Sequence, residues 1–331
     1  MSSSDITLKG FAKRCEAVRD LIDSLLTGRM EQSVLLCGAC GVGKSTLATL
    51  LAQGLLCREE DIARRPCGVC KSCVRVQKGT HPDCLKLQPD KGKKTVSVEN
   101  VRSVLSVLSR SPLEGSSRAV LIPRMEQLTD AAQNALLKTL EESQKGTWFL
   151  LTTDNETKVL STIRSRCRTV RVAPFQEEEI ASILLSEGVP ASRAETAAAL
   201  SEGSLTSARE IAQDDSFDRT QEWTVSLLFS GRGLEDYARL SSTLKNIKDQ
   251  TDDILRLGVQ ELRLLIRRSS AGEPLPDWAD GVWRHAPIER CRAVLEMILQ
   301  AQRMRQSNVS ASAVMDMLVQ QITEETSTWS L

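Results

Sequence analysis

Short apolar segments alternate with amphipathic helical patterns over the first half of the chain. The apolar or alternating segments predict β-strands, and they cover residues 33–38, 84–88, 118–122, 147–153 and 168–172. Leucine, valine and alanine recur between them at helical spacing and predict α-helices over residues 44–57, 97–110 and 130–143. Because strands and helices alternate, we expect βαβ units and a parallel sheet that is covered on both faces.

The strand patterns stop near residue 173, and helical patterns fill the rest of the chain. These patterns cover residues 174–188, 190–203, 204–213, 222–231, 234–244, 250–270, 288–306 and 310–322. A polar stretch over residues 214–221 separates the first three from the others and is typical of a linker. We therefore expect three domains: an α/β domain over residues 1–170, a small helical domain over 171–214 and an all-α domain over 215–331.

Charge and composition restrict the classes of partner. The 331 residues include 43 Lys and Arg against 43 Asp and Glu, so no net charge favours a nucleic acid or a membrane surface. No segment approaches the ~20 apolar residues that span a bilayer, and the N-terminal residues contain no signal-peptide pattern. We expect a cytoplasmic protein without membrane contact. Its ten cysteines are then unlikely to form disulfides, because that compartment is reducing.

The segment GACGVGKS at residues 38–45 fits a phosphate-binding loop, because it follows a predicted strand and opens a predicted helix. In such a loop, glycines let backbone N–H groups point at phosphate oxygens, the lysine reaches the outer phosphates, and a hydroxyl holds magnesium. The segment can therefore hold ATP with magnesium, and the alternative is a glycine-rich turn that binds nothing. The predicted nucleotide-binding residues are Gly38, Gly41, Gly43, Lys44, Ser45 and Thr46.

Four of the cysteines crowd between residues 57 and 73, in the segment CREEDIARRPCGVCKSC. Thiolates at this spacing can converge on one ion, and zinc suits four sulfur ligands in a redox-neutral structural role. An iron–sulfur cluster and four unconnected thiols are the alternatives. His81 and Cys84 lie nearby and are expected to be bystanders, since four ligands are already present. The predicted zinc ligands are Cys57, Cys67, Cys70 and Cys73.

The predicted strand at residues 118–122 ends in Pro123 and Arg124. A protein that hydrolyses ATP at a phosphate loop normally has acidic residues there, which hold magnesium and orient the attacking water. Proline carries no charge, and arginine repels the metal. Glu126 follows two residues later, and we expect this shift to move its side chain well away from the end of the strand. The sequence therefore predicts a protein that keeps the phosphate cradle without hydrolysing ATP efficiently.

These segments together resemble the clamp-loader branch of the AAA+ ATPases. The resemblance is strong over residues 31–172 and weaker beyond them. It implies an AAA+ parallel sheet with a zinc insertion, a small helical lid and a C-terminal helical collar through which subunits assemble. It rests on the phosphate loop, the cysteine module after its helix, HPDCLKL at 81–87, NALLKTLEE at 134–142 and STIRSRC at 161–167, in that order.

The resemblance also implies roles for single residues. Arg166, in the segment SRC, corresponds to a finger that acts in trans at the ATP site of a neighbouring motor subunit. Its alternative is an ordinary surface arginine or a partner for the acids of NALLKTLEE. Thr153 or Asp154 would sense the nucleotide within the chain's own site. Thr206 stands where motor subunits carry a lid arginine, and Arg209 lies about one helical turn further.

The missing lid arginine and the Pro123–Arg124 strand end favour the same conclusion. Within this resemblance, they imply a non-hydrolysing stator subunit of the bacterial DNA polymerase III clamp loader, which loads the sliding clamp onto primed DNA. The implied partners are the gamma/tau motor subunits, the delta subunit, the sliding clamp and primer–template DNA. An ATP-hydrolysing motor of the gamma/tau kind and a nucleotide-binding adaptor outside replication are the alternatives.

Overall fold

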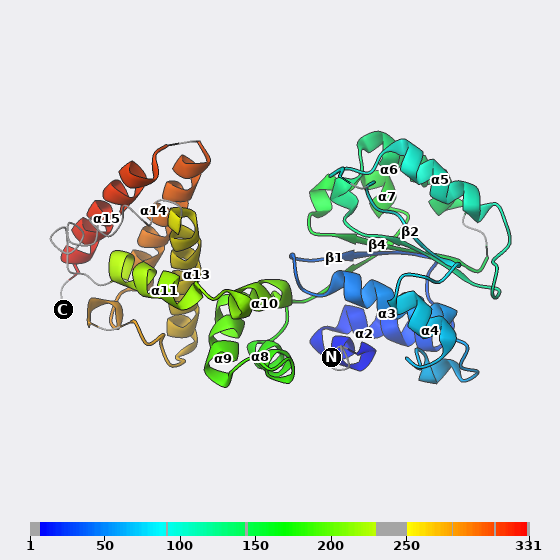
Figure 1. Ribbon diagram of the computed structural model, residues 1–331, viewed down its shortest axis with the longest axis horizontal. Coiled ribbons are helices and arrows are strands. Elements are labelled where there is room, and N and C mark those ends of the chain that lie inside the picture. Colours follow the sequence, from blue (N-terminus) through cyan, green and yellow to red (C-terminus); the bar gives the residue numbers. More distant parts are fainter. Residues whose placement is uncertain are drawn as a thin grey trace. The chain divides into compact units, whose positions relative to one another are not determined.

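The computed structural model describes residues 7–90, 92–142, 145–229, 250–279, 281–307 and 309–329 of the chain. The chain divides into two compact units (Figure 1). One comprises Met1–Val189 and Gly203–Ser207, and the other comprises Pro190–Glu202 and Ala208–Leu331. The helix predicted over residues 234–244 lies outside the described residues. Among the helices that are described, none combines the length and apolar character needed to cross a membrane.

A sheet of five parallel strands forms the centre of the first unit (Figure 1). Each strand falls within the segment that the apolar pattern predicted for it, which confirms the parallel α/β fold class. The strands lie in the order β2-β3-β4-β1-β5. They are β1 Ser33–Cys37, β2 Cys84–Lys86, β3 Arg118–Ile122, β4 Thr147–Thr153 and β5 Arg168–Arg171.

Several helices of this unit begin at polar caps. Ser97 and Asn100 form a capping box before α5, and the Thr129 hydroxyl accepts a hydrogen bond from the first turn of α6. Such caps satisfy N–H groups that have no partner within the helix. The helices are α1 Leu8–Arg14, α2 Glu16–Leu26, α3 Lys44–Leu56, α4 Lys71–Gln77, α5 Val98–Leu108, α6 Asp130–Glu141, α7 Ser161–Arg164 and α8 Glu177–Ser186, with short η1 Ile62–Arg64, η2 Met125–Gln127 and η3 Glu156–Lys158.

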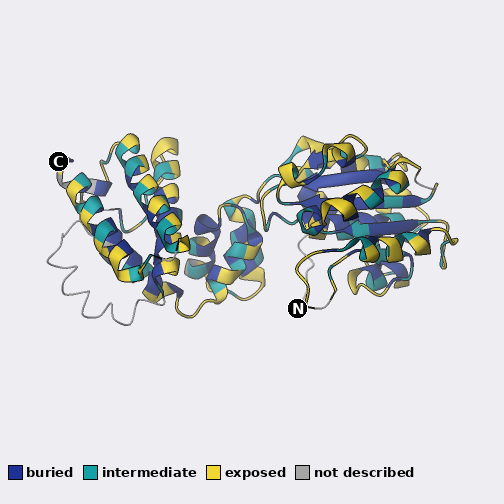
Figure 2. Cartoon of the chain, turned by 90° about the horizontal axis from the view of Figure 1, so that it is seen from above, coloured by how far each residue is buried: buried dark blue, intermediate teal, exposed yellow. Residues whose placement is uncertain are grey.

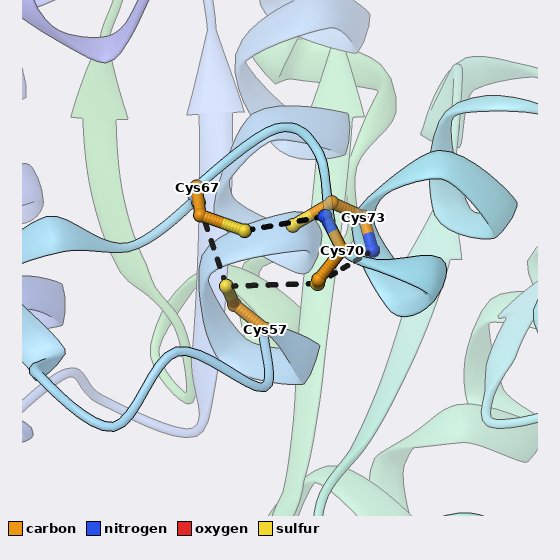
Figure 3. A group of neighbouring side chains, drawn as sticks. All are labelled: Cys57, Cys67, Cys70 and Cys73. Carbon is orange, nitrogen blue, oxygen red and sulfur yellow. Dashed lines mark hydrogen bonds between the residues drawn. The ribbon is translucent and has the colours of Figure 1, made fainter.

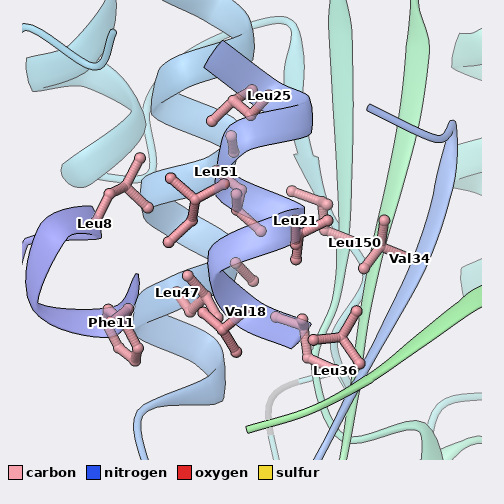
Figure 4. Close-up of a cluster of buried hydrophobic side chains, with 14 of the residues drawn as sticks. Leu8, Phe11, Val18, Leu21, Leu25, Val34, Leu36, Leu47, Leu51 and Leu150 are labelled. Carbon is pink, nitrogen blue, oxygen red and sulfur yellow. The ribbon is translucent and has the colours of Figure 1, made fainter. Parts of the chain in front are cut away.

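Helices cover both faces of the sheet. Every residue of β1 is buried, and successive side chains point to opposite faces. Val34 and Leu36 pack with the apolar side chains of α1, α2 and α3 (Figure 4). Leu35 packs on the other face with those of α5 and α6. The continuous apolar runs of the strands are therefore explained by burial on two sides.

The carboxyl ends of the parallel strands meet at one edge of this sheet, where α/β proteins bind ligands. There β1 leads into the phosphate loop, β3 leads into Pro123, and β4 leads into Asp154. Because β4 lies between β3 and β1, the three loops lie side by side. The strand order thus brings together segments that are more than 100 residues apart in the chain.

The second unit is helical over its described residues. Its helices expose one side and bury the other (Figure 2), and the core contains α13, α14 and α15. Aromatic rings of Phe229, Trp278, Trp283 and Trp329 contact one another in this core, with centroids 4.2 to 5.8 Å apart. The elements are α9 Ala191–Leu200, α10 Leu205–Gln213, α11 Phe217–Thr224, the π-turn η4 Val225–Phe229, α13 Thr251–Ala271, η6 Gly281–Trp283, α14 Ile288–Gln306 and α15 Ala311–Ser327, of which α10 starts in the first unit.

The prediction of a linker over residues 214–221 is wrong, because α11 begins at Phe217. Phe217 is buried, and the Arg193 guanidinium lies over its ring and pairs with Asp218. Of the polar residues that suggested a linker, Asp214, Asp215 and Ser216 precede the helix, and Asp218 and Arg219 are exposed on it. The predicted division into three domains at residues 170 and 214 stays a prediction.

Candidate nucleotide-binding and metal sites

The predicted phosphate loop connects β1 to α3 and has the backbone that its glycines allow. Gly41 and Gly43 have φ of +80° and +89°, a conformation that side chains disfavour. A Cβ atom at Gly41 would lie 1.9 Å from the Ser204 hydroxyl oxygen, and one at Gly43 would lie 2.9 Å from the Phe11 ring. Neither position therefore tolerates another residue without movement. Ser45 and Thr46 are exposed in the first turn of α3, where a phosphate would approach.

Lys44 is buried, and its ammonium is bonded within the protein. Its Nζ donates to the carbonyl oxygens of Gly38 and Ala39 at 2.9 and 2.6 Å. It also lies 2.6 Å from Oδ1 of Asp154, the residue that follows β4. The carboxylate of Asp154 therefore forms an ion pair with the ammonium that would bind a phosphate in such a loop. The resemblance assigns nucleotide sensing to Thr153 or Asp154, and this role stays a prediction. The Thr153 hydroxyl donates to Glu126.

Arg124 stands at the end of β3 in a left-handed conformation, with φ of 56°. Its N–H donates to the Thr152 hydroxyl at 3.1 Å, which ties this turn to β4. The guanidinium lies 3.8 Å from Oδ2 of Asp154 and 3.7 Å from Oε1 of Glu126. One carboxylate, that of Asp154, therefore pairs with both Lys44 and Arg124.

The expectation that Glu126 lies away from this edge is wrong. Its Oε2 accepts from the Thr153 hydroxyl at 2.9 Å and from the Asp154 N–H at 3.4 Å. The turn η2 redirects the chain after Arg124, so the side chain of Glu126 returns to the end of β4. The two-residue spacing between Arg124 and Glu126 in the sequence gives no sign of this turn.

Asp154 and Glu126, two acids described at this edge, already have cationic partners. Magnesium is bound through carboxylates that are free to ligate it. At this edge, Asp154 pairs with Lys44 and Arg124, and Glu126 pairs with Arg124 and holds the end of β4. Each of these carboxylates is thus already paired with a cationic side chain.

The segment that includes Thr206 lies against the phosphate loop within the first unit. The Leu205 N–H donates to the Gly41 carbonyl at 3.0 Å, and the Ser204 hydroxyl accepts from the Ser207 N–H at 3.2 Å. Thr206 is therefore near the loop, as expected for a residue in the lid arginine's position.

Arg14 contributes to the site and was not singled out from the sequence. Its Nη1 donates to the Val42 carbonyl of the phosphate loop at 3.1 Å. The guanidinium is buried against the rings of Phe175 and Phe11, at 3.2 and 4.2 Å from their centroids. Burial lowers the pKa of Arg14 to about 10. An arginine at the end of an amphipathic helix gives no sequence signal for such a contact.

The four cysteines of residues 57–73 form one cluster (Figure 3). Their Sγ atoms all lie within 4.8 Å of one another, so they can ligate a single ion. Burial raises the pKa of the Cys57 and Cys73 thiols. Burial acts in the same direction on Cys70, but N–H donors of Arg58 and Cys73 outweigh it and lower the pKa of that thiol to about 6. A closed set of four sulfurs fits a structural zinc ion.

His81 is not part of that cluster and has a packing role. Its Nε2 lies 3.0 Å from the Ser72 hydroxyl, which donates to the Leu56 carbonyl, and its Nδ1 accepts from the Asp83 N–H. Burial lowers its pKa, so the neutral ring is favoured. Asp83 is buried and accepts from the N–H groups of Leu113 and Glu114 at 2.7 and 2.8 Å. This network ties the cysteine module to the turn before β3.

Arg166 lies just after α7 and pairs with Glu141 at the end of α6. Its Nη1 donates to the Thr162 carbonyl at 2.8 Å, and the side chain is 33% exposed. Glu141 is the first acid of the LEE segment, so the structure realises the alternative of a partner for those acids. The pairing orients a guanidinium whose side chain remains partly exposed.

Comparison with known proteins gives the following similarities. A family model described as DNA polymerase III, delta subunit, matches residues 13–176. The DNA polymerase III subunit delta' of Escherichia coli (strain K12) is 37% identical over 224 residues, which cover 67% of this chain and 66% of that protein. The DNA polymerase III subunit delta' of Bacillus subtilis (strain 168) is 27% identical over 318 residues, which cover 92% of this chain and 94% of that protein. The first match thus spans just under two thirds of its relative, and the second spans nearly all of it.

One solved structure, of a DNA polymerase III, gamma subunit-related protein from Thermotoga maritima, aligns with 93% of this chain and all of that chain. The alignment has a TM-score of 0.41 at 15% identity.

Proposed function

This chain belongs to the DNA polymerase III delta-prime family, and we propose that it is a non-hydrolysing stator subunit of a clamp loader. In this role it assists motor subunits that use ATP to load a sliding clamp onto primed DNA. The family match covers the α/β unit, where the phosphate loop and the cysteine module lie. The proposed partners are the gamma/tau motor subunits, the delta subunit, the clamp and primer–template DNA, and the proposed location is the cytoplasm.

The observation that carries the non-hydrolysing role is the end of β3. Pro123 and Arg124 occupy the position from which a hydrolytic site would direct its acids at magnesium and water. The neighbouring acid, Asp154, is paired with Lys44 and Arg124. In this proposal the loop binds ATP through its glycines, Lys44, Ser45 and Thr46, and holds it without turnover.

The zinc ion, in this proposal, has a structural role. The ligands would be Cys57, Cys67, Cys70 and Cys73, whose sulfurs converge within one small volume. Four protein ligands leave no open position for a substrate. Bound zinc would close the insertion between α3 and α4, and the Ser72–His81 contact would connect it to the sheet.

Arg166 is the residue that we propose to act outside the chain. Charge on a transferring phosphoryl group is stabilised by a guanidinium supplied from a neighbouring subunit. Arg166 is partly exposed, and Glu141, its carboxylate partner among the described residues, is on the surface. A surface ion pair of this kind contributes at most about 1 kcal/mol. Arg166 can therefore leave Glu141 and bind a phosphate of a neighbouring ATP site at little cost in free energy.

The test is the ATP turnover of a loader reconstituted from this chain and its motor subunits. Arg166→Ala is expected to lower turnover by at least about tenfold, since trans arginines contribute strongly to phosphoryl transfer. Arg164→Ala is the matched control, because Arg164 is exposed and ends α7 two residues earlier. Assembly is checked by size-exclusion chromatography. Unchanged turnover in an assembled Arg166→Ala complex would remove this role.

The ATP-hydrolysing motor is a second candidate, and the position of Glu126 favours it. Its carboxylate lies at the end of β4, beside the Asp154 backbone, so one acid does reach the edge that holds the phosphate loop. ATP hydrolysis by the purified chain alone separates the two candidates. Turnover that disappears in both Lys44→Ala and Glu126→Gln would identify a motor, and the absence of turnover supports the stator.

A further inference from the structure

We propose that Arg124 takes the place of magnesium at this phosphate loop, so that the chain binds the phosphates of a nucleoside triphosphate without a divalent cation. The inference rests on the proposed nucleotide binding and goes beyond it. In this proposal, Arg124 determines whether the phosphate loop requires a divalent cation. The juxtaposition that supports it is the pairing of two cations, Lys44 and Arg124, with one carboxylate, Asp154.

The pairing brings Arg124 to the phosphate loop although the two are far apart in sequence. Asp154 Oδ1 lies 2.6 Å from Lys44 Nζ, and its Oδ2 lies 3.8 Å from Arg124 Nη2. Lys44 Nζ also donates to two carbonyls of the loop, so it lies inside the cradle. The carboxylate of Asp154 thus lies between the Arg124 guanidinium and the Lys44 ammonium, which is the group that binds phosphate in such loops.

Asp154 and Glu126 are poor ligands for a divalent cation here, and Arg124 is an unfavourable neighbour for it. Asp154 is held by two cations, while Glu126 is held by Arg124, the Thr153 hydroxyl and a backbone N–H. A magnesium ion near the end of β3 would need to displace these partners and would face the positive charge of Arg124. A guanidinium at the same place supplies a permanent positive charge and needs no carboxylate ligands.

The backbone holds the Cα atom of Arg124 in place, while the exposed side chain of Arg124 is able to move. The left-handed turn at Arg124 is held by the N–H bond to Thr152. The side chain is 55% exposed and lies 3.7 to 3.8 Å from its two acids, so both ion pairs are loose. Arginine presents planar N–H donors that match two phosphate oxygens at once. An arriving triphosphate can therefore replace Asp154 as the partner of Arg124 and Lys44 together.

The experiment is a calorimetric titration of ATP into the full purified chain, once with excess EDTA and once with magnesium. The expected dissociation constants agree within about threefold in the two conditions. Arg124→Asn is expected to weaken binding about tenfold or more in EDTA, the loss of one charge-assisted phosphate contact. Asparagine is chosen because it tolerates the left-handed backbone of this residue. Arg110→Asn is the matched control, since Arg110 is exposed and lies near the start of β3, at the opposite edge of the sheet.

Each outcome decides a separate point. Binding by the wild-type chain only in magnesium overturns this inference and leaves the proposed nucleotide binding standing. Binding in neither condition overturns both, and leaves the proposed role of Arg166 untouched. Binding in EDTA that Arg124→Asn does not weaken overturns the assignment to Arg124. Circular dichroism melting of each variant shows whether a loss of binding reflects a loss of folding.

Discussion

Lys44 of the phosphate loop forms an ion pair with Asp154, with 2.6 Å between Nζ and Oδ1. The two residues are 110 positions apart and meet because β4 lies directly beside β1 in the sheet. The Lys44 side chain is 5% exposed, so the carboxylate is the main charge partner of its ammonium. Any phosphate that enters the loop must compete with Asp154 for this lysine.

Neutralising Asp154 should therefore strengthen nucleotide binding. In Asp154→Asn, Lys44 and Arg124 lose a competing anion, and we expect ATP to bind about three- to tenfold more tightly, a gain typical of one partly screened charge pair. Titration calorimetry measures this. Asp23→Asn, at an exposed position of α2, is the control. Weaker binding by Asp154→Asn would instead show that Asp154 contacts the nucleotide favourably.

Removing the metal should destabilise the cysteine module selectively. Because the four sulfurs lie within 4.8 Å of one another, loss of an ion leaves thiols that crowd together without a common ligand. We expect Cys70→Ser to lose bound zinc in elemental analysis and to gain protease cleavage between residues 57 and 73. Cys40→Ser, an exposed cysteine outside the cluster, should keep its zinc. Equal zinc content in both variants would contradict the assigned ligands.

The carboxylate of Asp83 should be needed for the turn before β3. Its two oxygens accept from the N–H groups of Leu113 and Glu114, and Asp83 is buried. Asp83→Asn keeps one acceptor oxygen and leaves one donor unpaired, at a cost of about 1–3 kcal/mol in unfolding free energy. Hydrogen exchange should accelerate at these two amides. Protection equal to that of wild type would mean that the turn is held by other contacts.

Stability of the second unit should depend on pH through Glu261. Its carboxyl is 1% exposed and accepts from the side chains of Gln221 and Trp278, at 2.6 Å each. Burial raises the pKa of Glu261 above its ordinary 4.5, although these donors and the charge of Arg268 oppose the shift. The folded state therefore favours the protonated form, and this contribution to stability is lost as the pH rises above 4.5 through the raised pKa.

The variant Glu261→Gln removes this titration. The wild-type chain should lose unfolding free energy relative to the variant as the pH rises from 4.5 to neutrality, by about 1.4 kcal/mol for each unit of pKa shift. Urea unfolding at several pH values measures the difference, with Glu273→Gln at an exposed position as the control. A constant difference between the two chains over this range would show that Glu261 does not titrate with folding.

Much of the fold follows from local patterns. All the described strands lie within the segments that apolar periodicity indicated, and α14 matches its predicted bounds of residues 288–306. Polar composition misled at α11, where polar residues flank the buried Phe217. The glycines of the loop and the spacing of the cysteines are local features too. They allow chemistry to be predicted because the geometry they impose spans a few residues.

The sequence by itself determined the parallel sheet with its helices, the phosphate loop, the cysteine module and the missing acids at Pro123 and Arg124. Only the tertiary structure decided which charges meet. It paired Lys44 with Asp154, returned Glu126 to the site, and bonded Arg166 to Glu141. These contacts depend on the order of the strands and on a turn after β3, which hydrophobic periodicity does not encode. Periodicity reports which face of an element is buried, whereas the pairing of charges depends on which elements become neighbours.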